Sequence, residues 1–180
     1  MRQFKNTSLR YGVVAMLFHW IMAILIIGML ALGLYMSDLP KGLLKLKYYG
    51  WHKEIGLTIL GLVTLRVVWW IYNVRPILSD TMPAWQRFAA RTVHFALYIC
   101  MFAMPLTGWL MSSAAGVSVS FFGLFVMPDL ISPDVSARIL FKILHQWIAY
   151  GFIAAICGHT LAALHHHFIV KDDILKRMLP

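Results

Sequence analysis

The hydrophobic positions of the chain fall into four long runs rather than into short alternating segments. Three runs contain no Asp, Glu, Lys or Arg, and one is interrupted only by Arg66; they cover residues 11–37, 55–74, 92–128 and 143–170. A helix needs about 20 apolar residues to cross the roughly 30 Å hydrocarbon core of a bilayer. Runs of this length without alternation exclude a transmembrane β-barrel. The pattern predicts four membrane-spanning helices, at about 14–36, 51–73, 91–112 and 134–168.

Helix-breaking residues separate these runs. The segment 38–42 contains a proline and a glycine, and Pro76 follows the second run. Proline lacks the backbone donor that a helix interior requires. Before the fourth run, three residues fit the start of a helix. Ser132 can be the N-cap, Pro133 suits the first helical position, and Asp134 is an acid that the helix dipole favours there. The fourth helix is therefore predicted to begin in the interface, before the chain enters the hydrocarbon.

Composition places the chain among membrane proteins. Of its 180 residues, 61% are hydrophobic and 13% are charged, whereas a soluble domain carries about 25% charged residues. We expect one transmembrane domain over residues 1–180, with an all-α, four-helix-bundle fold. The first run is about twice as long as the roughly 7–15 apolar residues of a signal peptide, so we interpret it as a retained helix. The cysteines Cys100 and Cys157 form no C-x-x-C motif, which argues against a disulfide framework and covalent haem attachment.

Basic residues are divided unequally between the two ends of the predicted bundle. The end with both termini carries nine, which are Arg2, Lys5, Arg10, Arg75, Arg87, Arg91, Lys171, Lys176 and Arg177. The other end carries six, which are Lys41, Lys45, Lys47, Lys53, Arg138 and Lys142. Because Lys and Arg favour the cytoplasmic side, we expect an inner-membrane protein with both termini in the cytoplasm. The formal net charge of +9 is then explained by topology and anionic lipid rather than by nucleic acid.

Apart from the tract 165–167, the chain has five histidines, and all lie in or near the ends of the apolar runs: His19, His52, His94, His145 and His159. Ionisable groups at membrane depth usually face the bundle interior and indicate function. His145 and His159 are 14 residues apart, close to four helical turns, which places them on one helix face about 21 Å apart. The fourth helix therefore offers two ligands at two depths.

Helix direction pairs these histidines with partners on other helices. His19 begins the first helix on the side where the fourth helix ends, so it can meet His159. His52 begins the second helix on the side where the fourth begins, so it can meet His145. Two facing imidazoles at each depth favour bis-histidine b-type haem over zinc, which normally takes three or four protein ligands. We therefore expect two b haems, with these four histidines as iron ligands.

Several neighbouring residues fit a haem-binding bundle. Arg66 lies at the inner depth, where it could bind a haem propionate or could instead extend to the lipid headgroups. Gly56 and Gly158 would let backbone approach a flat macrocycle, whereas Gly33 is interpreted as a helix-packing position. His94 has no evident partner, and we interpret it as a hydrogen-bonding or haem-edge residue.

The tract 165–167 consists of three consecutive histidines near the inner end of the fourth helix. Consecutive helical positions point in different directions, so the tract does not form a metal site by itself. His166 lies two turns after His159 and on the same face. It could exchange a proton with a membrane quinone near neutral pH, or it could be an interfacial histidine that contacts headgroups.

A set of short motifs accompanies these histidines along nearly the whole chain. The motifs are Arg10-Tyr11-Gly12, His19-Trp20, His52-Lys53-x-x-Gly56 with Arg66, His145, His159, His166-His167-Phe168-x-x-Lys171-Asp172, and Arg177-Met178. On this basis the sequence resembles the prokaryotic cytochrome b561 family of small four-helix membrane cytochromes. The resemblance implies two b haems at the four histidines and electron transfer with ubiquinone or another quinone. It also implies a one-electron donor on the outer side, superoxide among the candidates, and it links His166 with the quinone.

These observations predict a dihaem cytochrome that moves single electrons across the inner membrane between an outer donor and the quinone pool. With superoxide as donor it would be a superoxide:quinone oxidoreductase. One alternative is an electron-carrier subunit for a partner dehydrogenase or periplasmic protein. A second alternative is a histidine-based proton or metal transporter. Absorbance of bound haem separates both cytochrome functions from the transporter.

The six basic residues at the outer end flank the predicted entrances to the outer haem. Four acids oppose them, namely Asp38, Glu54, Asp129 and Asp134, and leave a net charge of +2 at this end. Cations near an electron-accepting haem would attract a small anion such as superoxide, and salt would screen that attraction. The alternative is that these side chains bind headgroups or haem propionates.

Overall fold

The computed structural model describes residues 3–74, 76 and 82–179. Within these residues it contains four long helices, α1 (Val13–Asp38), α2 (Leu43–Ile71), α3 (Ala84–Ala114) and α4 (Val135–His165). A π-helical turn, η1 (His166–Val170), continues α4, and two short strands, β1 (Ser120–Phe121) and β2 (Phe125–Val126), form a hairpin between α3 and α4. All four helices are long and apolar enough to cross a membrane. The chain is therefore an all-α, multi-pass membrane protein, as the hydrophobic pattern predicts.

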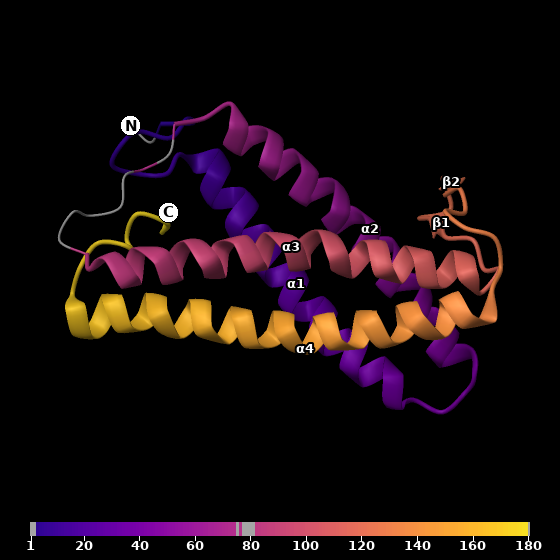
Figure 1. Cartoon of the computed structure of the whole chain (residues 1–180). Coiled ribbons are helices and arrows are strands. Elements are labelled where there is room, and N and C mark those ends of the chain that lie inside the picture. Colours follow the sequence, from indigo (N-terminus) through magenta and orange to yellow (C-terminus); the bar gives the residue numbers. More distant parts are fainter. Residues whose placement is uncertain (1–2, 75, 77–81, 180) are drawn as a thin grey trace.

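The helices form an antiparallel bundle with both termini at one end (Figure 1). In the same view α3 and α4 lie side by side, while α1 and α2 run obliquely across them. Close packing joins α3 to α4, α1 to α2, and α2 to α3. The α1–α2 connection and the β1–β2 hairpin lie at the end opposite the termini. This end is called the outer end below, and the end with the termini is called the inner end.

Two helices begin earlier than the sequence predicts. α2 begins at Leu43 rather than near residue 51, and α3 begins at Ala84 rather than near residue 91. Gly42 and Pro83 directly precede these starts. The additional turns carry basic side chains, so they lie outside the apolar runs. Hydropathy identifies the part of a helix that crosses hydrocarbon and misses the polar turns that extend beyond it.

The ends of α4 also differ from the prediction. Asp134, rather than Ser132, is the N-cap, and its carboxylate accepts a hydrogen bond of 2.6 Å from the backbone N–H of Ala137. The carboxylate satisfies a helix donor that would otherwise have no partner. At the other end the α-helix stops at His165 and the chain continues as the π turn η1.

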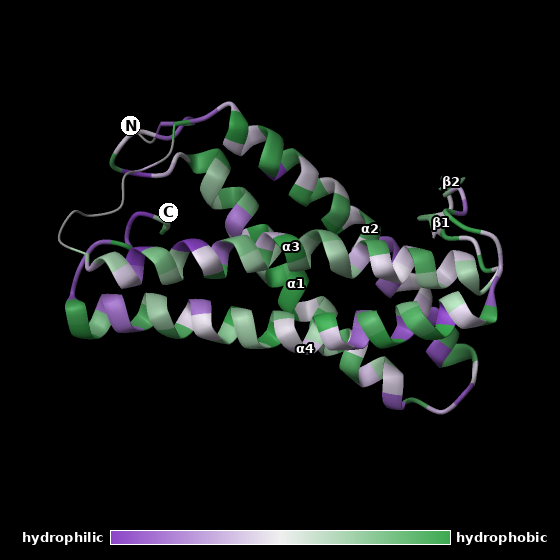
Figure 2. Cartoon of the chain, viewed as in Figure 1, coloured by the Kyte–Doolittle hydropathy of each residue, from purple (hydrophilic) through white to green (hydrophobic). Residues whose placement is uncertain are grey.

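The centre of the bundle is an apolar core. Its buried members are Met22, Ile26 and Met29 of α1, Ile59 and Val63 of α2, Met101 of α3 and Phe152 of α4. Figure 2 shows hydrophobic residues along the middle of the helices and hydrophilic residues at the ends and connections. Many large apolar side chains on the helices are exposed, such as Ile24 and Leu65, and this exposure is expected where a helix faces lipid. The core therefore separates the inner and outer ends of the bundle.

Candidate cofactor site

The structure brings together the two predicted histidine pairs. The ring centroids of His19 and His159 are 6.1 Å apart, and those of His52 and His145 are 6.2 Å apart. Both pairs meet edge to face, at interplanar angles of 71° and 70°. The first pair lies at the inner end and the second at the outer end. That these histidines bind iron stays a prediction.

The spacing within each pair fits a shared metal ion. A metal bonded at about 2 Å to one nitrogen of each of two imidazoles places the ring centres about 6 Å apart. The helix pairs that carry these histidines, α1 with α4 and α2 with α4, are not closely packed along their lengths in the described parts of the chain. Across residues 3–74, 76 and 82–179, no group of three or more His, Cys, Asp and Glu side chains is arranged as a metal site. Paired imidazoles between separated backbones are the donor set of bis-histidine haem.

Thr107 of α3 contacts His145, whose ring also has a hydrogen bond with the backbone of Met104. Its hydroxyl donates to the backbone carbonyl of Ala103 at 2.7 Å and lies 3.0 Å from His145 Nδ1. Because the hydroxyl proton is engaged by the helix, its oxygen accepts the Nδ1–H of the imidazole. This arrangement leaves the Nε2 lone pair available to a metal. Thr107 was not predicted from the sequence, because a threonine inside an apolar helix ordinarily bonds its own backbone.

Two glycines make room for the outer pair. A Cβ on Gly33 of α1 would lie 3.3 Å from Cε1 of His52, and a Cβ on Gly108 of α3 would lie 3.3 Å from Cε1 of His145. Gly33 is thus a helix-packing position, as predicted, and the side chain packed against it is the candidate ligand His52. Gly108 was not predicted. The buried Nδ1 of His52 has no hydrogen-bond partner among the described residues. An unpaired buried polar atom of this kind is unfavourable unless a bound group supplies the partner.

Polar side chains surround the inner pair. The ring of His94 lies 5.3 Å from that of His159, beside the inner pair, and its role as a hydrogen-bonding or haem-edge residue stays a prediction. The guanidinium carbon of Arg66 lies 5.5 Å from the centre of the Tyr98 ring, which is within cation–π distance. Burial and the nearby Tyr98 raise the pKa of Tyr11 above its ordinary value, while Arg66 acts to lower it. Arg66 therefore belongs to a polar cluster beside the candidate ligands.

The C-terminal segment covers part of the inner end. The indole N–H of Trp20 donates to the carbonyl of Met178 at 2.9 Å. His166 Nδ1 lies 2.5 Å from a carboxylate oxygen of Asp172, and the buried Nδ1 of His167 has no partner in the described part of the chain. This segment thus folds back against the start of α1, next to His19.

The outer basic residues are only partly available to an external anion. The ammonium of Lys45 donates to the carbonyls of Ser37 and Leu39 at 2.9 and 2.7 Å, so it caps the end of α1. The ammonium of Lys47 lies 4.8 Å from the centre of the Trp51 ring. These contacts give two of the six predicted cations a structural role.

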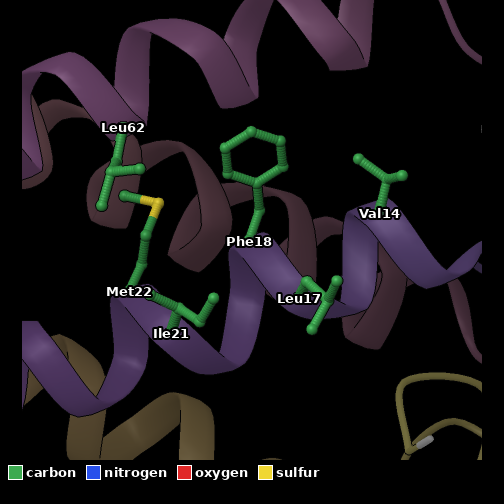
Figure 3. Close-up of a pocket in the computed structure, with 6 residues that line it drawn as sticks. All are labelled: Val14, Leu17, Phe18, Ile21, Met22 and Leu62. Carbon is green, nitrogen blue, oxygen red and sulfur yellow. The ribbon is translucent and has the colours of Figure 1, made fainter.

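A shallow apolar hollow of about 180 Å³ lies along α1 and α2. Its lining consists of Val14, Leu17, Phe18, Ile21, Met22 and Leu62 (Figure 3). The side chains drawn there carry no nitrogen or oxygen, so they offer no hydrogen bond to a substrate. The hollow can accommodate an aliphatic chain but has no groups for catalysis.

Comparison with known proteins gives a consistent result. The family model for prokaryotic cytochrome b561 matches residues 10–180. In Escherichia coli K12, cytochrome b561 homolog 2 is 40% identical, with 98% of this chain and 94% of the relative covered. Cytochrome b561 homolog 1 of the same organism is 35% identical over 72% of this chain and 73% of its own length. A Yersinia pestis protein named probable superoxide oxidase CybB is 29% identical, with 98% and 96% covered.

Proposed function

Because this chain belongs to the prokaryotic cytochrome b561 family, whose members are membrane electron-transfer proteins with b-type haem, we propose that it holds two b haems within one transmembrane domain spanning residues 1–180. It carries single electrons across the inner membrane, between an outer donor and the quinone pool. The observation that carries the proposal is the presence of two imidazole pairs at the two ends of one bundle. Both termini lie in the cytoplasm, since basic residues are more numerous at that end.

The chain's own residues hold and separate the two cofactors. His19 with His159 binds the inner haem, and His52 with His145 binds the outer haem. When bound, haem supplies a one-electron redox centre whose potential depends on its ligands and their hydrogen bonds. Phe152 is buried in the core, seven residues from each histidine of α4. The apolar core between the pairs excludes water, so that charge crosses the membrane as electrons rather than as ions.

The quinone site lies at the inner end in this proposal. Asp172 accepts a hydrogen bond from Nδ1 of His166 and orients the ring. The Nε2 of His166 then holds or releases the proton that accompanies electron transfer to or from a quinone. His167 lies beside it, with a buried ring nitrogen that lacks a partner among the described residues. The pair Asp172–His166 supports a proton-exchanging role more directly than simple contact with headgroups.

Superoxide is the proposed outer donor, which would make the protein a superoxide:quinone oxidoreductase. The name of the Yersinia pestis relative supports this choice. The exposed cations at the outer end, among them Lys41, Arg138 and Lys142, provide an attractive field for a small anion. Lys45 contributes less than the sequence predicts, since its ammonium is bound to the end of α1.

The experiment follows electrons from the protein to quinone in liposomes. We expect pre-reduced protein to be reoxidised by ubiquinone, and His166→Gln to slow this step about tenfold while haem content stays the same. Asp172→Asn should slow it in the same direction, because a neutral amide oxygen is a weaker acceptor for the ring than the carboxylate. His165→Gln is the matched control, since His165 is exposed and lies one position earlier. Reoxidation at an unchanged rate in both His166→Gln and Asp172→Asn would contradict the quinone site.

A further inference from the structure

The tip of the β1–β2 hairpin is apolar and exposed. The twelve residues 117–128 contain no Asp, Glu, Lys or Arg. The side chains of Phe122, Leu124, Phe125 and Val126 are 52, 77, 53 and 65% exposed. A connection that faces water is ordinarily polar. An exposed apolar tip of this kind marks a surface that contacts another phase or molecule.

The base of the hairpin is firmly attached to the bundle. The N–H of Met127 donates to the carbonyl of Val119, which is buried, and the indole N–H of Trp109 donates to the carbonyl of Pro128. Ser118 donates to Asp129 at 2.9 Å. These bonds fix both arms of the hairpin, so the exposed tip is held in one position.

The turn at the tip uses an unfavourable residue. Phe122 and Gly123 both have positive φ, 50° and 70°, and the N–H of Leu124 donates to the carbonyl of Phe121 at 2.9 Å. This is the two-residue type I′ turn, which strongly prefers Asn or Gly at its first central position. A phenylalanine there is strained. The ring of Phe122 meets the ring of Phe121 edge to face, with ring centres 4.9 Å apart.

Glu54 of α2 ties the strained turn to the start of the membrane span. Its carboxylate accepts a hydrogen bond of 3.2 Å from the backbone N–H of Phe122. Glu54 is the last charged residue of α2 before Arg66, and the apolar run begins directly after it. The tip therefore lies level with the boundary where α2 leaves the polar region and enters hydrocarbon. In Figure 1 the hairpin projects from the outer end of the bundle, away from both termini.

We propose that the hairpin 120–126 inserts its tip into the outer leaflet of the membrane. Its partner is lipid at the boundary between headgroups and acyl chains, where aromatic and aliphatic side chains partition favourably. The helices of the same bundle expose many apolar side chains to lipid as well, which supports lipid as the partner in preference to a protein. Since Glu54 is two residues from His52, the bilayer holds this loop over the outer histidine pair. The proposal depends on the membrane topology and is independent of the electron-transfer function.

The test measures the depth of the tip in lipid nanodiscs. Cys100 and Cys157 are replaced by alanine, and a fluorophore is attached to a new cysteine in Leu124→Cys or, as a second site, Phe125→Cys. Lys41→Cys is the control, because Lys41 is an exposed charged residue in the other outer connection. We expect lipids with a spin label near the headgroup to quench the tip fluorophores about twofold more strongly than the control fluorophore.

Two substitutions of Glu54 test whether its hydrogen bond to the turn positions the tip. Glu54→Ala should reduce quenching at position 124 to near the control level, because the turn loses its anchor. Glu54→Gln should retain the quenching, because its amide oxygen still accepts the bond from the backbone of Phe122. If both tip fluorophores were quenched by aqueous iodide and not by the labelled lipids, the hairpin would face water as a protein-docking surface and the proposal would be overturned.

Discussion

At the scale of single residues, the candidate ligands of the outer pair contact small residues of other helices, Gly33 beside His52 and Thr107 and Gly108 beside His145. The histidines themselves were predictable, because an ionisable side chain inside an apolar run requires an explanation. Thr107 and Gly108 were not predictable as partners of His145, because they lie on another helix and are typical of helix interiors in membranes. His94 was placed at the correct end of the bundle, but its contact with His159 depends on side-chain geometry. Only the packed bundle shows these neighbours.

Removal of the Thr107 hydroxyl should change one haem potential. In Thr107→Val the Nδ1–H of His145 loses the hydroxyl as an acceptor and keeps only the backbone of Met104, so the imidazole becomes a weaker donor and the oxidised state of the outer haem is less stabilised. We expect its midpoint potential to rise by about 40 mV, which corresponds to a hydrogen bond of about 1 kcal/mol. Thr107→Ser should restore the original value. A redox titration that shows no shift, or a shift of the inner component, would contradict this role.

Substitution of Gly33 should affect the outer site selectively. Gly33→Ala places a Cβ 3.3 Å from the ring of His52, so the ring must move and the outer haem should be retained less well. Gly28→Ala is the control on the same helix, because its Cβ would meet nothing within 4 Å. Alanine is favoured over glycine in a helix by roughly 0.5–1 kcal/mol, so the control should be neutral or stabilising. Equal haem content in the two variants would show that the space around the His52 ring is not restricted by position 33.

At the scale of elements, the number and type of the helices could be predicted, while their polar extensions could not. The four apolar runs each exceed or approach the length of a span, which makes their identity secure. The first turns of α2 and α3 lie outside the apolar runs and have no side-chain cap hydrogen bond, so neither a hydrophobic pattern nor a capping residue marks them. The hairpin was missed because a type I′ turn ordinarily carries Asn or Gly where this chain has Phe122.

The C-terminal segment should respond to pH through Asp173. The guanidinium of Arg177 lies 2.9 Å from its carboxylate, and this hydrogen bond holds the pKa of Asp173 below its ordinary value of 3.8. A lowered folded-state pKa gives stability that is present above pH 3.8 and is lost as the pH falls through the folded value. The carboxylate is exposed, so the effect is small. Hydrogen exchange should show faster opening of residues 173–178 in Asp173→Asn near neutral pH, and this difference should vanish in strong acid.

At the scale of the whole molecule, α4 places His145 and His159 at opposite ends of one apolar core. The two-level arrangement follows from helix periodicity and direction, which is why it could be predicted from the sequence. The charge distribution of the outer end was predicted less well. A count of lysines and arginines does not show that Lys45 caps α1 or that Lys47 contacts Trp51.

Electrostatic steering of superoxide should depend on the outer cations. Lys41→Glu combined with Lys142→Glu removes two exposed cations and adds two acids, and should slow reduction of the outer haem at low salt by about tenfold. The effect should fade as the ionic strength rises and the Debye length falls below about 10 Å. Lys171→Glu combined with Lys176→Glu is the control at the inner end. A rate that depends on neither salt nor the outer charges would favour a neutral or protein donor.

The central claim is that each histidine pair binds its own b haem. The most direct measurement is the haem content and absorption spectrum of purified His159→Ala and His52→Ala beside the unchanged protein. We expect two haems per chain in the unchanged protein and about one in each variant, with a different spectral component lost in each. A protein without a Soret band, a content far below two haems per chain, or loss of the same component in both variants would contradict the account.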